Sequence, residues 1–103
     1  MTAYVVSVCD ITSVTPALKA YAQLSADLAH RHGGRYIVRG KPADVVEGSH
    51  LAGKSMVILE FPSMEQLQAY LNGAEYLGSV KPLREGTGFY DIGVYEAPPP
   101  EMQ

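Results

Sequence analysis

The sequence is poor in the features that mark secreted, redox-active and membrane-spanning proteins. It has one cysteine and no tryptophan, and no apolar run approaches the roughly 20 residues of a membrane-spanning helix. A single cysteine excludes an internal disulfide and any Cys-x-x-Cys redox or metal motif, so we expect Cys9 to be a buried thiol. The N-terminus has no basic segment ahead of an apolar one. We therefore expect a soluble protein of the reducing cytoplasm.

Positive charge is also scarce. Eight Lys and Arg residues stand against eleven Asp and Glu residues, which gives a formal net charge of −3. Nucleic-acid binding needs a basic stripe, and the densest basic group here, residues 30–39, flanks the glycine pair Gly33 and Gly34. Basic residues at such a place are typical of a helix C-terminus, where they complement the helix dipole. We expect neither nucleic acid nor a membrane as a partner.

Ligands for a metal or cofactor are missing at useful spacings. His30 and His32 are two residues apart, so on a helix their side chains point in different directions. Asp27 and His30 share a helix face, but one carboxylate and one imidazole are too few for zinc or iron. We therefore expect no metal site and no fixed cofactor.

The chain does contain enough apolar sequence for one domain. Apolar residues make up 47% of its 103 residues, and a chain shorter than about 150 residues is normally a single domain. We expect residues 1–96 to form this domain and residues 97–103 to form a proline-rich tail. A domain of this size leaves much of its surface exposed, which favours burial against a second copy.

Apolar runs and turn formers predict six elements in the order β-α-β-β-α-β. The strands are expected at residues 3–10, 35–39, 55–61 and 89–96, with residues 43–47 extending the second strand past an interruption at 40–42. One helix begins at Pro16 after the cap Thr15 and ends at Gly33, and a second begins after Ser63 and runs in pieces towards Pro82. This is the split βαβ order of the ferredoxin-like sandwich, an α+β fold with two helices on one face of a four-stranded antiparallel sheet.

Apolar side chains indicate which faces are buried. The first helix carries a stripe of Ala17, Tyr21, Leu24 and Leu28, and the second carries Met64, Leu67, Leu71 and Ala74. Strands 3–10 and 55–61 are apolar on both faces, although two helices cover only one face of the sheet. The uncovered face needs another apolar layer, so we expect a homodimer in which two sheets meet face to face.

Several separated blocks of the chain resemble the domain-of-unknown-function 1330 family. They are residues 33–40 (GGRYIVRG), 46–48 (VEG), 59–63 (LEFPS), 75–76 (EY) and 83–86 (LREG). The resemblance extends from Tyr4 to Tyr95 and implies membership of the dimeric α/β-barrel superfamily, with a ferredoxin-like fold. The family has a Trp-x-x-Ser-Pro-Glu-Tyr segment, and here Gly73 and Ala74 stand in its serine and proline positions.

Arg39 and Glu60 are the first candidate ligand-binding residues. If strands 35–47 and 55–61 pair through a turn at 48–53, Arg39 lies near Glu60, and an arginine keeps a carboxylate ionised among apolar neighbours. One interpretation is an anion-binding or acid–base pair that lines a cavity. The other is a structural ion pair at the rim of the sheet or at the dimer interface.

Tyr76 and Arg84 are the second candidate pair, because both belong to blocks that match the family. The planar guanidinium of Arg84 suits a substrate carboxylate. The alternative is an ion pair between Arg84 and a neighbouring carboxylate such as Glu47 or Glu85.

The residues leave three interpretations of function open. The first is a small-molecule-binding dimeric barrel, which includes an enzyme that works without a fixed cofactor. The second is a non-catalytic dimeric module whose charges serve the interface. The third, a cofactor-free monooxygenase or isomerase, rests on analogy alone. The superfamily also contains haem-degrading and stress-responsive proteins, so its fold selects no reaction.

Overall fold

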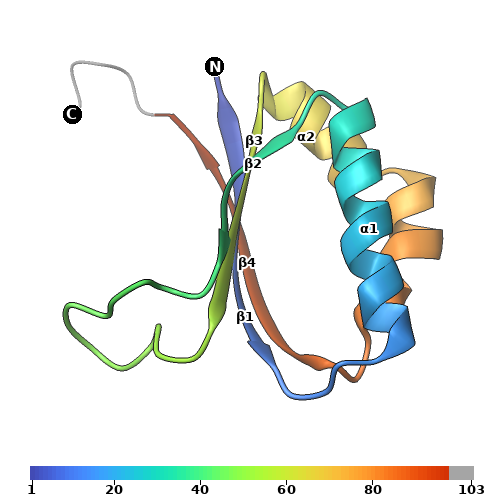
Figure 1. Cartoon of the computed structure of the whole chain (residues 1–103). Helices are drawn as coiled ribbons and strands as arrows, with labels where there is room; N and C mark the ends of the chain where they lie inside the picture. The colour runs from blue at the N-terminus through green and yellow to red at the C-terminus, as the bar shows by residue number, and fades with distance from the viewer. Residues whose placement is uncertain (98–103) are drawn as a thin grey trace.

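The computed structural model describes residues 1–97, which form a sheet with helices on one face (Figure 1). Its elements are β1 (Ala3–Ile11), α1 (Pro16–Arg31), β2 (Arg35–Gly40), β3 (Ser55–Phe61), α2 (Met64–Leu71), the π-helical turn η1 (Tyr76–Val80), the 3₁₀ turn η2 (Lys81–Arg84) and β4 (Gly88–Glu96). Neighbouring strands are antiparallel, in the order β2-β3-β1-β4. The predicted ferredoxin-like α+β fold is confirmed. Of the predicted proline-rich tail, residues 98–103 lie outside the described residues.

Local sequence determines both ends of α1. The hydroxyl of Thr15 accepts a hydrogen bond from an amide of the first turn at 3.0 Å. Pro16 occupies that turn, where its missing N–H has no intrahelical partner to lose. At the other end Gly33 has a φ of 84°, and the Gly34 amide donates to the Ala29 carbonyl at 2.8 Å. The chain therefore leaves α1 and enters β2 within three residues of the helix end.

The buried face of α1 differs from the predicted stripe. Leu24 is 45% exposed and Ala17 is exposed, whereas Ser25 is buried beside Leu28. The reason is the contact with α2, where the Tyr70 hydroxyl approaches the Ser25 carbonyl at 3.5 Å. Close packing of this kind favours a small side chain at the contact, and an apolar stripe alone does not reveal it.

Residues 41–54 form an arm instead of extending the second strand. β2 ends at Gly40, whose φ of 135° takes the chain out of the sheet. Pro42 then has no amide proton to donate to a ladder. The predicted extension 43–47 therefore forms no strand. Figure 1 shows the arm projecting on the side of the sheet that faces away from the helices.

α2 begins at the predicted cap. The Ser63 hydroxyl accepts a hydrogen bond from the Gln66 amide at 3.2 Å. The Gln66 side chain donates to the His32 carbonyl and so ties α2 to the end of α1. Leu67 is buried as predicted, whereas Ala74 lies beyond α2 and is exposed. The turns η1 and η2 then complete the helical layer.

The core lies between the sheet and the helical layer. Phe61, Leu67 and Val80 are fully buried there. The ring centre of Tyr70 lies 5.4 Å from that of Phe61 and 5.0 Å from that of Tyr76. These tilted rings pack together in the core between sheet and helices, and Tyr70 and Tyr76 also line the cavity that lies beside them.

Candidate functional site

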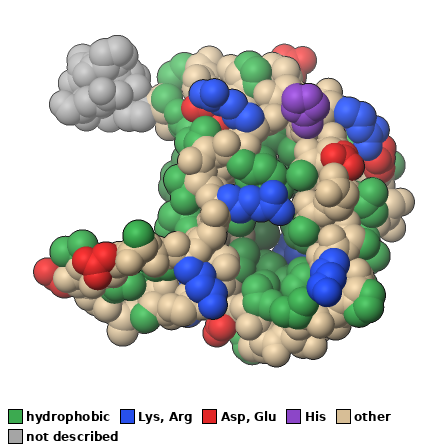
Figure 2. All heavy atoms as spheres, viewed as in Figure 1, with side chains coloured by type: hydrophobic (Ala, Val, Ile, Leu, Met, Phe, Trp, Pro, Cys, Tyr) green, Lys and Arg blue, Asp and Glu red, His purple; other side chains and the backbone are tan. Residues whose placement is uncertain are grey.

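A cavity of about 70 Å³ lies between the sheet and the helices, and we call it the inner cavity. Five of the seven tyrosines line it: Tyr21, Tyr36, Tyr70, Tyr76 and Tyr90. The other lining residues are Val5, Ser7, Cys9, Val57, Leu59, Leu71 and Ile92. Figure 2 shows a hollow between the sheet and the helical layer, with basic side chains around it. The cavity therefore combines an apolar wall with phenol hydroxyls.

Strand alternation brings the sheet residues of the cavity together. Val5, Ser7 and Cys9 of β1 pair with Leu59, Val57 and Ser55 of β3, and with Val94, Ile92 and Tyr90 of β4. Residues paired across a ladder share a face, so these side chains all point towards the helices. Cys9 is a buried thiol, as predicted, and its Sγ lies 3.0 Å from the Ser7 hydroxyl.

A β-bulge decides which way Arg39 points. Arg35 pairs with Glu60 at the start of the ladder. The register then shifts at Ile37, so Arg39 pairs with Val57 on the inner face. Without the extra residue, Arg39 would share the outer face with Glu60, because a shift of one residue moves a side chain to the opposite face. The predicted contact between Arg39 and Glu60 is therefore wrong.

Glu60 forms its ion pair with Arg35 on the outer face. The Nε atom of Arg35 lies 2.9 Å from a Glu60 carboxylate oxygen, and a terminal guanidinium nitrogen lies 2.8 Å from the same oxygen. The Arg35 side chain is 72% exposed. Glu60 thus faces away from the inner cavity and belongs to a structural ion pair at an edge strand.

Arg39 lies over an aromatic ring at the edge of the inner cavity. Its Cζ atom is 4.5 Å from the ring centre of Tyr36, which is a cation–π distance. Within residues 1–97, Arg39 forms no ion pair. The positive charge of Arg39 therefore lies beside Tyr36, at the edge of the cavity, without an ion-pair partner among residues 1–97.

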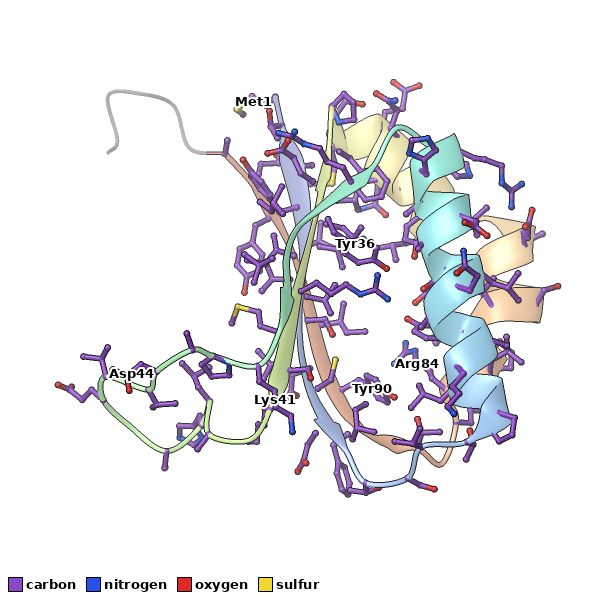
Figure 3. The ribbon with its side chains drawn as sticks, viewed as in Figure 1. Met1, Tyr36, Lys41, Asp44, Arg84 and Tyr90 are labelled. Carbon is purple, nitrogen blue, oxygen red and sulfur yellow. The ribbon has the colours of Figure 1, made fainter. Side chains whose placement is uncertain are left out.

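Arg84 extends from the end of η2 into the space between helices and sheet, where it lies near Tyr90 (Figure 3). Its Cζ atom is 4.7 Å from the ring centre of Tyr90 and 5.8 Å from that of Tyr21. Its Nε atom is buried and has no hydrogen-bond partner in the described part of the chain. The alternative ion pairs with Glu47 or Glu85 are not formed within residues 1–97.

Thr87 holds Arg84 and Tyr90 in place. Thr87 is 1% exposed, and its hydroxyl bonds both the Arg84 carbonyl and, at 2.7 Å, the Tyr90 hydroxyl. Its own carbonyl accepts from the amides of Thr12 and Ser13 at 2.8 and 3.0 Å. One buried threonine therefore joins the loop after β1, the end of η2 and the start of β4.

Tyr76 and Arg84 act on the same neighbouring phenol. Burial raises the pKa of Tyr21 far above its ordinary value, and Tyr76 raises it further by charge and hydrogen bonding, while Arg84 opposes the rise. Burial is also the main cause that raises the pKa of Tyr70, again reinforced by Tyr76. Tyr21 and Tyr70 are therefore neutral hydrogen-bond donors at any physiological pH.

Several residues of this site were not expected from the sequence. Tyr90 has a usable signal, since strand alternation from Tyr95 and Ile92 assigns it a face. Tyr36 and Arg39 share the inner face only because of the bulge. No glycine or other turn-forming residue at Ile37 predicts this bulge from the sequence. Thr87 was not singled out either: its hydroxyl partners Arg84 and Tyr90 are three residues away on each side, but its contacts with Thr12 and Ser13 lie far away along the chain.

The inner cavity offers phenol hydroxyls, and Arg39 and Arg84 lie against three of the tyrosines that line it. In the described part of the chain the lining itself contains no Asp, Glu, Lys, Arg or His residue. Among residues 1–97, no group of three or more His, Cys, Asp or Glu side chains is placed to hold a metal ion, and no helix is long and apolar enough to cross a membrane. His32 packs at an angle against the Tyr70 ring, with ring centres 6.2 Å apart. The arrangement suits binding and polarisation of a small polar molecule.

A comparison with models of protein families found a match. Residues 2–97 match the model of a domain of unknown function, DUF1330. The chain belongs to the DUF1330 family. A search of curated proteins found no match to this DUF1330 chain.

Solved structures resemble this DUF1330 chain in fold. One is the RPA0582 protein of unknown function from Rhodopseudomonas palustris, with a TM-score of 0.72 and 16% identity, over 96% of this chain and 84% of the other. Another is a mutant of SnoaB, a cofactor-independent oxygenase from Streptomyces nogalater, with a TM-score of 0.64 and 11% identity, over 93% and 92% of the chains. At these identities the likeness concerns the fold.

Proposed function

We propose that this chain binds a small molecule in the inner cavity, between the sheet and the helices. The observation that carries the proposal is the buried Nε atom of Arg84, which has no hydrogen-bond partner within residues 1–97 and belongs to a guanidinium that lies over Tyr90 and near Tyr21, two of the five tyrosines of the cavity. Ligand sites are typically apolar hollows with a few convergent polar groups, and this cavity has that character. In this proposal residues 1–96 act as one domain in the cytoplasm.

A ligand screen with a cavity-filling variant tests this proposal. Binding to the folded state raises its stability, by about 2.7 kcal/mol at a ligand concentration 100 times the dissociation constant. We expect hits from a metabolite panel to raise the melting temperature of the wild type. Ile92→Phe fills the cavity from a partly exposed position and should abolish these shifts.

Val14→Phe is the matched control, because Val14 is exposed in the loop between β1 and α1. It should leave every shift unchanged. A panel without a single hit would contradict the proposal and would favour the non-catalytic dimeric module. Hits that Ile92→Phe leaves untouched would place the ligand elsewhere.

The outer face of the sheet supports a homodimer as part of the proposal. It carries no helix (Figure 1), and Phe89 and Tyr95 are 71% and 57% exposed on it. A groove of about 140 Å³ runs between this face and the arm, lined by Val8, Val38 and Met56 among others. Exposed apolar surface of this kind marks an interface, and a second copy with the same face would cover it.

Light scattering after size-exclusion chromatography tests the dimer. The wild type should have twice the mass of one chain, and Val8→Glu, which places a charge in the centre of the outer face, should have the mass of one. Val14→Glu is the matched control. A wild-type monomer with intact secondary structure would refute the dimer and leave the ligand proposal standing.

A cofactor-independent enzyme, either an oxygenase or an isomerase, is the second candidate function. The fold shared with SnoaB, a cofactor-independent oxygenase, is the observation that favours it. Oxygen consumption and product analysis on every compound that binds test it. Turnover that falls in Tyr76→Phe while binding persists would support an enzyme. Binding without turnover of any hit would support a binding protein.

A further inference from the structure

Resting on the proposed function, we infer that the ligand of the inner cavity is a small organic acid, bound as its anion by Arg84. The charge and burial of Arg84, together with the size and polarity of the cavity, lead to this class of ligand. The inference concerns one chemical group, a carboxylate attached to a planar apolar body.

The first step is the state of the Arg84 guanidinium. An arginine side chain is always ionised in proteins and carries five N–H donors. The Nε–H of Arg84 is buried and has no acceptor within residues 1–97. A buried donor of this kind costs free energy unless an acceptor reaches it, and an anionic acceptor forms the strongest bond.

The second step is that Arg84 has no counter-ion within residues 1–97. The ion pairs formed within residues 1–97 are Arg31 with Glu75 and Arg35 with Glu60. Arg31 and Glu75 are exposed partners, and Glu60 faces the other side of the sheet. In the described part of the chain the cavity lining holds no charged side chain, and the charged group that packs against two of its tyrosines, Tyr21 and Tyr90, is the cation Arg84.

The third step is a second positive charge on the same side of the sheet. The bulge at Ile37 turns Arg39 to the inner face, where it lies over Tyr36. Figure 3 shows Tyr36, Tyr90 and Arg84 all directed into the space between sheet and helices. Arg84 and Arg39 therefore attract an anion to this cavity, while Arg84 is the one with a buried free donor.

The fourth step is size and polarity. The cavity measures about 70 Å³, against about 150 Å³ for a cavity that encloses benzene. It therefore holds an acid group and a few carbon atoms, and the rest of a larger ligand extends through its opening. The apolar residues Val5, Val57 and Leu59 disfavour strongly hydrated dianions, and the tyrosine rings favour a flat body.

Calorimetry with acids and their neutral amides tests the inference. The probes are benzoate against benzamide, crotonate against crotonamide, and inorganic phosphate. We expect each acid to bind about tenfold or more tightly than its amide, because only the anion forms an ion pair with Arg84 in addition to a hydrogen bond. Phosphate should bind more weakly than either acid.

Variants assign the effect to Arg84. Arg84→Gln should weaken acid binding about tenfold or more and leave amide binding unchanged. Arg31→Gln is the matched control, since it removes one positive charge from an exposed ion pair outside the cavity. It should change neither affinity. Equal loss of acid binding in both variants would mean that acid binding depends only on the net charge of the protein, and it would overturn the inference.

Cys9 supplies a readout that needs no variant. Its thiol is the only one in the chain and lines the inner cavity. Benzoate should slow its alkylation by a small maleimide, and benzamide at the same concentration should not. Equal protection by acid and amide would overturn the anion inference while supporting a ligand in the cavity. Protection by neither, with hits in the wider screen, would overturn the acid class alone.

Discussion

The guanidinium of Arg84 lies 4.7 Å from the centre of the Tyr90 ring, and the buried hydroxyl of Thr87 bonds to both residues. Two segments that follow one another in sequence, η2 and β4, are thereby fixed relative to each other. The contact places a positive charge against the wall of a cavity that no carboxylate of residues 1–97 lines.

Removal of the Arg84 charge should leave folding almost unchanged. Arg84→Met loses cation–π contacts with Tyr90 and Tyr21, but it also removes a buried donor without a partner. These terms are of similar size, so we expect the free energy of unfolding to change by less than about 1 kcal/mol. Urea unfolding measures it. A loss above about 3 kcal/mol would make Arg84 a structural residue.

A double-mutant cycle tests the register of β2. The pair Arg35→Ala and Glu60→Ala should show a coupling energy of about 0.2–1 kcal/mol, because the ion pair is formed but largely exposed. The pair Arg39→Ala and Glu60→Ala should show none, since these residues lie on opposite faces. Urea unfolding of both cycles gives the comparison. Coupling of Arg39 with Glu60 would refute the bulge at Ile37.

Alkaline pH should reveal the buried phenols. The pKa of Tyr21 and of Tyr70 is raised by burial, so the folded chain holds protons that the unfolded chain releases. Stability is then fully present below the ordinary tyrosine pKa of about 10 and falls as pH rises above it.

Absorbance at the wavelength of tyrosinate follows this titration. We expect at least two of the seven tyrosines to ionise only when the chain unfolds. Tyr21→Phe should make unfolding less sensitive to pH above about 10. Ionisation of all seven in one reversible step, with the fold intact, would contradict the burial of these phenols.

The junction of α1 with β2 should tolerate no side chain at Gly34. A Cβ atom there would lie 2.6 Å from the Phe61 ring. Gly34→Ala should therefore destabilise the chain by about 1–3 kcal/mol. Gly78→Ala is the matched control, because nothing lies within 4 Å of a Cβ atom at Gly78. Thermal unfolding of both variants measures the difference, and equal melting temperatures would contradict the tight packing at Gly34.

The fold was predictable because its signals are local. Thr15 with Pro16 and Ser63 with Gln66 mark the helix starts, and each cap forms the expected hydrogen bond. Gly33 and Gly34 mark the end of α1. Once these boundaries are known, the order β-α-β-β-α-β selects the ferredoxin-like sandwich.

The site was predictable only in part, because it depends on one residue of register. Tyr76 lines the inner cavity, Arg84 packs against its lining residue Tyr90, and Arg39 lies over its lining residue Tyr36. Glu60 does not, since the bulge at Ile37 leaves it on the outer face with Arg35. A bulge changes the face of every later side chain in its strand, yet it needs no special sequence.

The resonance of the Arg84 Nε–H group in a ¹H–¹⁵N spectrum tests the central claim most directly. A buried Nε–H exchanges slowly with water and gives a separate signal, assigned by its loss in Arg84→Lys. Titration with benzoate should shift this signal in a saturable way, and titration with benzamide should leave it in place. A signal that ignores benzoate while other signals report binding would contradict the claim that Arg84 receives the ligand in the inner cavity.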